Sequence, residues 1–112
     1  MRVVHHKKEP YDVLIDRTTI FGNPWTHKER TKAQFVVASR KEAISNYRKW
    51  LTGEDFQDVL PEQRQRILEA LPRLRGLALG CWCAPLPCHG EVLIELIEGK
   101  EPENPILDLF ER

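Results

Sequence analysis

The segment from Gly80 to Gly90 contains every cysteine of the chain and is the part of the sequence richest in reactive groups. It reads Gly-Cys-Trp-Cys-Ala-Pro-Leu-Pro-Cys-His-Gly, so that three thiols and one imidazole lie close together. A thiol becomes a nucleophile when its pKa is lowered, and thiols with imidazoles also form zinc ligand sets. The segment therefore indicates a reactive or substrate-contacting site, with metal binding and simple core packing as the alternatives.

The position of this segment favours Cys88 as its central group. A short buried strand is expected over Leu77–Trp82, and a helix is expected to begin near Cys88. The free amides and the dipole at a helix start favour a thiolate, so we expect a lowered pKa for Cys88. We assign Cys88 as nucleophile, His89 as its acid/base partner and Cys83 as a resolving thiol or second ligand.

A zinc site is the alternative interpretation of the same residues, with Cys81, Cys83, Cys88 and His89 as ligands. The spacing differs from a pair of C-x2-C knuckles, and the neighbours Cys88 and His89 would crowd one tetrahedron. We therefore expect no metal cofactor, and zinc remains the alternative. Cys81 lies inside the expected strand, where packing is the better interpretation, since free cysteine is among the most buried residue types.

Arg17 and Asn23 are the candidate substrate-binding residues. Gly22 and Pro24 indicate a turn, and an amide held beside a guanidinium can bind a carboxylate, a phosphate or a base edge. In the alternative interpretation, Asn23 closes its own turn and Arg17 forms an ordinary ion pair.

The elements that must position these residues predict a small α/β fold. A strand is expected over 11–17, and Ser39-x-x-Glu42 is a capping box at the start of an amphipathic helix over 40–52. Further helices are expected over 61–71, where Pro72 should end or kink the helix, and over 89–98. These elements predict one domain over residues 1–112, with a short, mostly parallel sheet packed by three helices and a C-terminal tail from 102 to 112. The expected core residues are Val13, Ile15, Ile44, Tyr47, Leu51, Leu68, Leu79, Val92 and Leu96.

Composition and charge limit the partners. The 112 residues balance 17 basic against 17 acidic side chains, so there is no bulk attraction to nucleic acid. The balance is uneven, because residues 1–50 carry 11 basic and 5 acidic groups and residues 51–112 carry 6 and 12. A basic face toward a phosphate-bearing ligand is therefore one expectation, and mutual cancellation of the two halves is the other. No apolar run approaches the roughly 18 residues of a membrane span.

The chain also resembles a known family. The resemblance is carried by Arg17, Phe21-Gly22-Asn23-Pro24, Tyr47-Arg48-x-Trp50-Leu51, Leu74-Arg75-Gly76, Gly80-Cys81-Trp82-Cys83 and Pro87-Cys88-His89-Gly90-Glu91-Val92-Leu93. These blocks are similar to a family of small bacterial and phage domains classified as a domain of unknown function, over about residues 11–98. Many members carry an acidic residue after the Cys-His block, as Glu91 does here, whereas relatives tend to have glycine where this chain has Asp16. The family implies no activity.

The sequence thus predicts an enzyme or binding protein that acts on a nucleotide or nucleic-acid component through a Cys/His-lined pocket. The alternative is a zinc-binding or protein-interaction module without catalysis, with residues 106–110 of the tail as its apolar contact. The N-terminal residues lack the apolar segment of a secretion signal, and the clustered, odd number of cysteines does not suit a disulfide framework. We therefore expect a cytoplasmic protein with reduced thiols. The reaction and the oligomeric state are left open.

Overall fold

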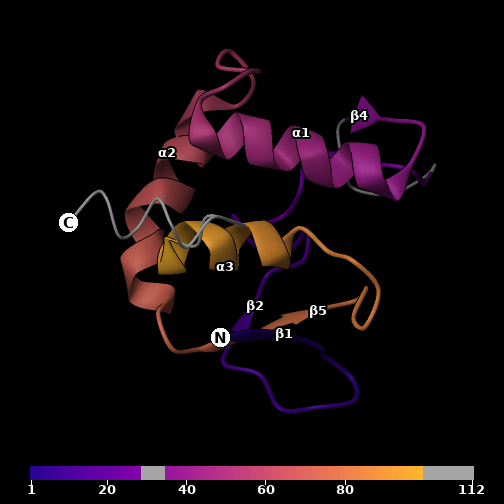
Figure 1. The fold of residues 1–112 in the computed structure, drawn as a ribbon, viewed down its shortest axis with the longest axis vertical. Coiled ribbons are helices and arrows are strands. Elements are labelled where there is room, and N and C mark those ends of the chain that lie inside the picture. Colours follow the sequence, from indigo (N-terminus) through magenta and orange to yellow (C-terminus); the bar gives the residue numbers. More distant parts are fainter. Residues whose placement is uncertain (29–34, 100–112) are drawn as a thin grey trace, which may run out of the picture.

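Three short strands that all run in the same direction form the main sheet (Figure 1). β1 (Arg2–His5) and β2 (Val13–Leu14) flank the central strand β5 (Ala78–Cys81), and Gly80 pairs with both neighbours. β-branched and aliphatic residues supply most of the two outer strands, as is typical of a parallel sheet covered by helices. The expectation of an α/β fold with a short parallel sheet is confirmed.

The structure is a computed structural model that describes residues 1–28 and 35–99. The expected tail over 102–112, with its apolar stretch at 106–110, lies outside the described residues. In the described ranges, no helix is both long and apolar enough to cross a membrane.

The three helices begin and end close to the expected positions. They are α1 (Arg40–Thr52), α2 (Pro61–Ala70) and α3 (Gly90–Glu98), and a 3-10 turn, η1 (Leu71–Leu74), follows α2. The change from α to 3-10 geometry falls just before Pro72, whose ring cannot continue the α-helical hydrogen bonds. The sequence therefore predicted both the helices and the break after α2.

Capping interactions explain the bounds of α1. The Ser39 hydroxyl accepts a hydrogen bond from the Glu42 amide at 3.1 Å, and the Glu42 carboxylate accepts one from the Ala38 amide at 3.2 Å. Gly53 ends the helix with φ of 81°, a left-handed conformation that glycine adopts without strain. These contacts fix the position of Arg40, which is the first residue of the helix.

A second, two-stranded sheet begins directly after the turn over residues 21–24. β3 (Trp25–Thr26) pairs in parallel with β4 (Phe35–Val36), and the Trp25 ring stacks on Phe35 at 5.7 Å between centroids.

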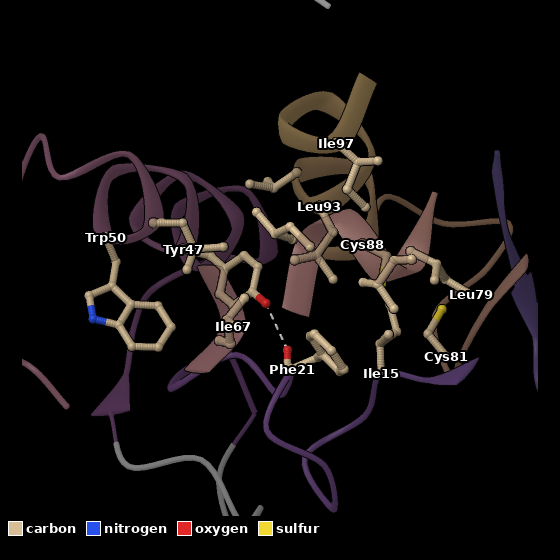
Figure 2. Packing of buried hydrophobic residues seen from close by; sticks show 14 of the residues in the cluster. Ile15, Phe21, Tyr47, Trp50, Ile67, Leu79, Cys81, Cys88, Leu93 and Ile97 are labelled. Carbon is tan, nitrogen blue, oxygen red and sulfur yellow. Dashed lines mark hydrogen bonds between the residues drawn. The ribbon is translucent and has the colours of Figure 1, made fainter. Parts of the chain in front are cut away.

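The hydrophobic core lies between the sheet and the helices. α3 lies between the main sheet and α1, and it contacts both of them (Figure 1). Figure 2 shows the buried cluster, in which the Tyr47 hydroxyl from α1 donates to the Phe21 carbonyl at 2.8 Å. Five of the expected core residues are buried, namely Ile15, Tyr47, Leu51, Leu79 and Val92. The other four, Val13, Ile44, Leu68 and Leu96, are half-buried at its margin.

The strands are shorter than expected. The 11–17 strand is reduced to Val13–Leu14, although the backbone amides of Asp12 and Ile15 still donate to the Ala78 and Gly80 carbonyls at 2.9 Å. The 77–82 strand is reduced to β5, after which Trp82 leaves the sheet with 54% of its surface exposed. Both reductions bring the chain out of the sheet beside the candidate site.

Candidate thiol site

The carboxyl ends of the three parallel strands meet at one edge of the main sheet. His6 follows β1, Asp16 and Arg17 follow β2, and Trp82 and Cys83 follow β5. Ligands in parallel α/β folds generally bind outside this edge. The topology therefore brings together reactive residues that are far apart in the sequence.

A cleft of about 510 Å³ opens at this edge. It is lined by all the candidate site residues from the sequence, namely Arg17, Asn23, Cys81, Cys83, Cys88 and His89. Its other walls are Asp16, Thr18, Trp25, Thr26, His27, Lys28, Arg40, Ala43, Ile44, Trp82, Leu86 and Pro87. The volume is within the range of small-molecule sites. The residues thus share one cleft, and their catalytic or binding roles stay predictions.

A larger cleft of about 650 Å³ lies between the 17–24 loop and the start of α2. It shares Arg17 and Asn23 with the first cleft but has no cysteine or histidine in its lining. Because it offers no nucleophile or acid/base group of that kind, we place the candidate site in the smaller cleft.

The three thiols contact one another at the base of the cleft. Cys81, Cys83 and Cys88 all line the cleft and are close enough to shift one another's pKa, and none forms a disulfide. The Cys81 sulfur also accepts hydrogen bonds from the amides of Cys83 and Ala84, at 3.3 and 3.4 Å. Cys81 and Cys88 are buried, whereas Cys83 is partly exposed. Cys83 is therefore the most accessible thiol of the cluster.

The contacts within the cluster place the negative charge on Cys83. Hydrogen bonds from Cys81 and Cys88, together with the Arg40 guanidinium, hold the pKa of the Cys83 thiol well below its ordinary value and outweigh the opposing effect of burial. The same contact with Cys83 raises the pKa of Cys81. One thiolate is thus stabilised by two neighbouring thiols and one arginine.

The expected low pKa of Cys88 is wrong. Its contacts with Cys81 and Cys83, together with burial, raise the pKa of Cys88, although the Gly90 amide at the helix start donates to its sulfur at 3.4 Å. One weak amide contact at the helix start does not offset burial and a neighbouring thiolate. Cys88 therefore keeps its proton, and it is 1% exposed.

His89 is held by a fixed pair of contacts. Its Nε2 lies 2.7 Å from the Ile15 carbonyl oxygen, and its Nδ1 lies 3.4 Å from the Cys88 sulfur. A carbonyl oxygen only accepts, so Nε2 carries the ring proton and donates it. Burial lowers the pKa of His89, which favours the neutral ring and leaves Nδ1 as an acceptor for the Cys88 thiol proton. Tyr47 packs edge-on against the ring at 5.1 Å between centroids.

Arg17 and Asn23 hold the wall of the cleft together. Arg17 donates to the carbonyls of Asn23 and Trp25 at 3.1 and 2.9 Å. Asn23 is buried, donates to the Ala43 carbonyl at 3.0 Å and accepts from the Trp25 amide at 3.0 Å. These contacts match the interpretation of Asn23 as a residue that closes its own turn, while both side chains still border the cleft.

The comparison with known proteins assigns the chain to a family. The sequence profile of the family described as "Domain of unknown function (DUF4326)" matches residues 2–99. This chain belongs to the DUF4326 family. It is also 35% identical, over 97 residues, to a protein of Enterobacteria phage T4 described as an uncharacterized 12.4 kDa protein in the nrdA-td intergenic region. That alignment covers 86% of this chain and 76% of the phage protein. No solved structure matches the chain.

Arg40 of this DUF4326 domain was not among the site residues expected from the sequence. Arg40 lies in the cleft beside Cys83, and its guanidinium also approaches the Pro87 carbonyl at 3.5 Å. The capping box at Ser39 does locate the first residue of α1. The sequence around Arg40, however, does not indicate which loop packs against the start of this helix. Arg40 could have been found only by placing α1 against the 83–88 loop.

A second missed feature is the set of contacts around Trp82 at the rim. The indole Nε1 donates to the Asp16 carboxylate at 3.0 Å, and the His6 ring lies 4.0 Å from the indole between centroids. The Lys7 ammonium sits 4.7 Å from the ring centroid, in a cation–π contact. These contacts fix the orientation of an exposed aromatic ring.

The DUF4326 domain shows no preformed metal site in residues 1–28 and 35–99. Within these ranges, no group of three or more His, Cys, Asp or Glu side chains is arranged to hold a metal ion. The sulfurs of Cys81 and Cys88 accept hydrogen bonds from backbone amides. Zinc binding therefore stays the alternative prediction from the sequence.

Proposed function

We propose that the cleft binds a phosphate-bearing nucleotide or nucleic-acid component, with Cys83 as the reactive group that faces it. The observation that carries this proposal is the convergence of cationic side chains and a stabilised thiolate on one cleft. Arg17, Lys28 and Arg40 border it, against the single carboxylate of Asp16. A guanidinium binds phosphate oxygens with directional, charge-assisted hydrogen bonds.

The carboxylate does not cancel the basic character of the cleft, because it is already engaged. Asp16 accepts hydrogen bonds from Thr18 and from the Trp82 indole. Burial raises the pKa of Asp16, but these hydrogen bonds outweigh it and bring the pKa below its ordinary value. The carboxylate is thus directed at Thr18 and Trp82 and leaves the cleft with an excess of cationic side chains.

Trp82 supports the nucleotide part of the proposal. An exposed, fixed aromatic ring at the rim of a basic cleft can stack on a nucleobase, a contact worth about 1–3 kcal/mol per base. A thiolate below it can attack an electrophilic carbon or phosphorus of the bound component, forming a bond to sulfur and displacing a leaving group.

The test is a binding titration by isothermal calorimetry with the four ribonucleoside 5′-monophosphates and with inorganic phosphate. Arg40→Gln should weaken nucleotide binding about tenfold or more, because it removes a cation from the cleft. Lys41→Gln is the matched control, since Lys41 is the next residue of α1, is exposed and lies outside the cleft.

Binding should also weaken as salt concentration rises, as expected when phosphate contacts contribute to affinity. The proposal is wrong if no nucleoside monophosphate binds at millimolar concentration. Equal losses in the Arg40 and Lys41 variants would also contradict it.

A further inference from the structure

The thiol cluster holds more groups than a single nucleophile needs. Cys83 is partly exposed, while Cys88 is buried with 1% of its surface exposed, and both line the same cleft at opposite ends of the 83–88 loop. Behind Cys88 stands His89, whose Nδ1 has no proton of its own and lies 3.4 Å from the Cys88 sulfur. A partly exposed thiol, a buried thiol and a base thus border the same cleft.

We propose that Cys83 and Cys88 form a dithiol redox centre in which a hydroperoxide oxidises Cys83 and Cys88 then closes a disulfide, with His89 as its base. The inference rests on the proposed function in one respect, because Cys83 is the reactive thiol of the cleft in both. It adds a second class of reactant, a small hydroperoxide, and a way to switch the reactive thiol off.

The first step takes place in the open cleft. The Cys83 thiolate attacks one oxygen of the hydroperoxide, a sulfur–oxygen bond forms and the oxygen–oxygen bond breaks. The leaving alkoxide or hydroxide takes a proton from solvent, so that sulfur is oxidised to a sulfenic acid and the peroxide is reduced to an alcohol or water. Arg40, beside Cys83, is placed to stabilise the charge that leaves.

The second step uses the buried pair. The Cys88 sulfur attacks the sulfur of the Cys83 sulfenic acid, and its proton passes to Nδ1 of His89. A sulfur–sulfur bond forms, the sulfur–oxygen bond breaks, and the departing hydroxide takes up that proton as water. A small-molecule thiol then restores both cysteines by thiol–disulfide exchange.

The geometry distinguishes the roles of Cys81 and Cys88. The Cys81 sulfur accepts hydrogen bonds from the amides of Cys83 and Ala84, and within residues 1–28 and 35–99 no histidine is hydrogen-bonded to it. Cys81 and Cys83 are also separated by only one residue, which leaves little freedom to reach relaxed disulfide geometry. Cys88 comes from the other end of the loop and has His89 next to it.

The test treats the reduced, full-length protein with a small excess of hydrogen peroxide and reads the products by mass spectrometry. All three thiols fall between Arg75 and Lys100, so trypsin leaves them on one peptide and fragment ions must locate the link. The wild type should lose two thiols, link Cys83 to Cys88 and recover both with dithiothreitol. Its oxidation should be at least tenfold faster than that of free glutathione at pH 7.

Variants separate the two steps. Cys88→Ser should stop at a Cys83 sulfenic acid that dimedone traps, whereas Cys81→Ser, the matched control, should still form the disulfide. His89→Gln keeps an amide donor for the Ile15 carbonyl but offers no base, so sulfenic acid should form and disulfide closure should slow at least tenfold.

Three results would overturn the inference: a disulfide that includes Cys81, a disulfide in Cys88→Ser that joins Cys81 to Cys83, or oxidation no faster than that of glutathione. The calorimetric titration of the reduced protein keeps this test separate from the proposed function. If nucleotides fail to bind but the disulfide forms normally, only the proposed nucleotide-binding function is refuted. If nucleotides bind but no Cys83–Cys88 disulfide forms, only the proposed redox centre is refuted.

Discussion

At the scale of single residues, Cys83 and Cys88 have different exposures and different pKa shifts, which the sequence alone does not reveal. Cys83 is partly exposed and is stabilised as a thiolate by Cys81, Cys88 and Arg40, whereas Cys88 is buried with its proton directed at His89. The helix start after Cys88 favoured it as the nucleophile, but burial beside another thiolate outweighs one amide contact. Of the three thiols, Cys83 is the one whose pKa is lowered and the one on which Arg40 acts.

Tyr47 packs against the His89 ring from the core. Its hydroxyl gives a testable prediction at the residue scale. Tyr47→Phe removes the bond to the Phe21 carbonyl and leaves a buried acceptor without that partner, which should lower the free energy of unfolding by about 1–3 kcal/mol. Urea denaturation checks this, with Tyr11→Phe as the control because Tyr11 is exposed. Equal effects in the two variants would contradict the assigned role.

The same residue gives a pH dependence. Burial raises the pKa of Tyr47 well above its ordinary value of about 10. Above pH 10 the unfolded chain therefore loses this proton before the folded chain does, so the stability that Tyr47 contributes is full below pH 10 and declines as pH rises through the folded-state value. The stability difference between wild type and Tyr47→Phe should shrink above pH 10.

At the scale of elements, the placement of α3 against the sheet decides whether the site forms. Gly90, the first residue of α3, packs so closely that an added Cβ would lie 2.6 Å from Ile15 Cδ1 and 2.8 Å from Val3 Cγ2. The same approach brings His89 to the Ile15 carbonyl. A larger residue at position 90 would separate the helix from β2 and from this hydrogen bond.

Gly90→Ala should therefore lower the free energy of unfolding by about 1–3 kcal/mol, the usual cost of overpacking, even though alanine suits a helix better than glycine does. Thermal or urea unfolding measures the change, and Glu91→Ala at the next, exposed position is the control. Adding Ile15→Val, which removes the clashing Cδ1, should restore part of the loss. A Gly90→Ala protein as stable as the wild type would refute the close packing.

At the scale of the whole molecule, the fold was predicted better than the site. Capping residues, helical periodicity and Pro72 are local signals, and they placed α1, α2 and α3 to within a residue. The loop with three cysteines was also evident, because its composition alone marks it. The topology then brought that loop to the ends of β1 and β2, as parallel strands require.

The sequence could not show which residues that are far apart in the chain lie close together in the fold. Arg40 joins Cys83 only because α1 packs near the 83–88 loop, and Asp16 meets Trp82 only because β2 and β5 are neighbours. The lowered pKa of Cys83 depends on Cys81, two residues before it, and also on Cys88 and Arg40, which the fold brings near it. The position of Cys88 at a helix start predicted that Cys88 would have the lowered pKa. In the folded protein, tertiary contacts lower the pKa of Cys83 instead.

The rate at which each cysteine is alkylated by iodoacetamide, followed by mass spectrometry between pH 5 and pH 9, tests the central claim most directly. Cys83 should react first, and its rate should change little as pH falls below about 8.5, the ordinary pKa of a cysteine, because its pKa is lowered. Arg40→Gln should move that profile to higher pH, and Lys41→Gln should leave it unchanged. A rate that falls tenfold per pH unit below 8.5, faster reaction at Cys88, or thiols protected by stoichiometric zinc would contradict the account.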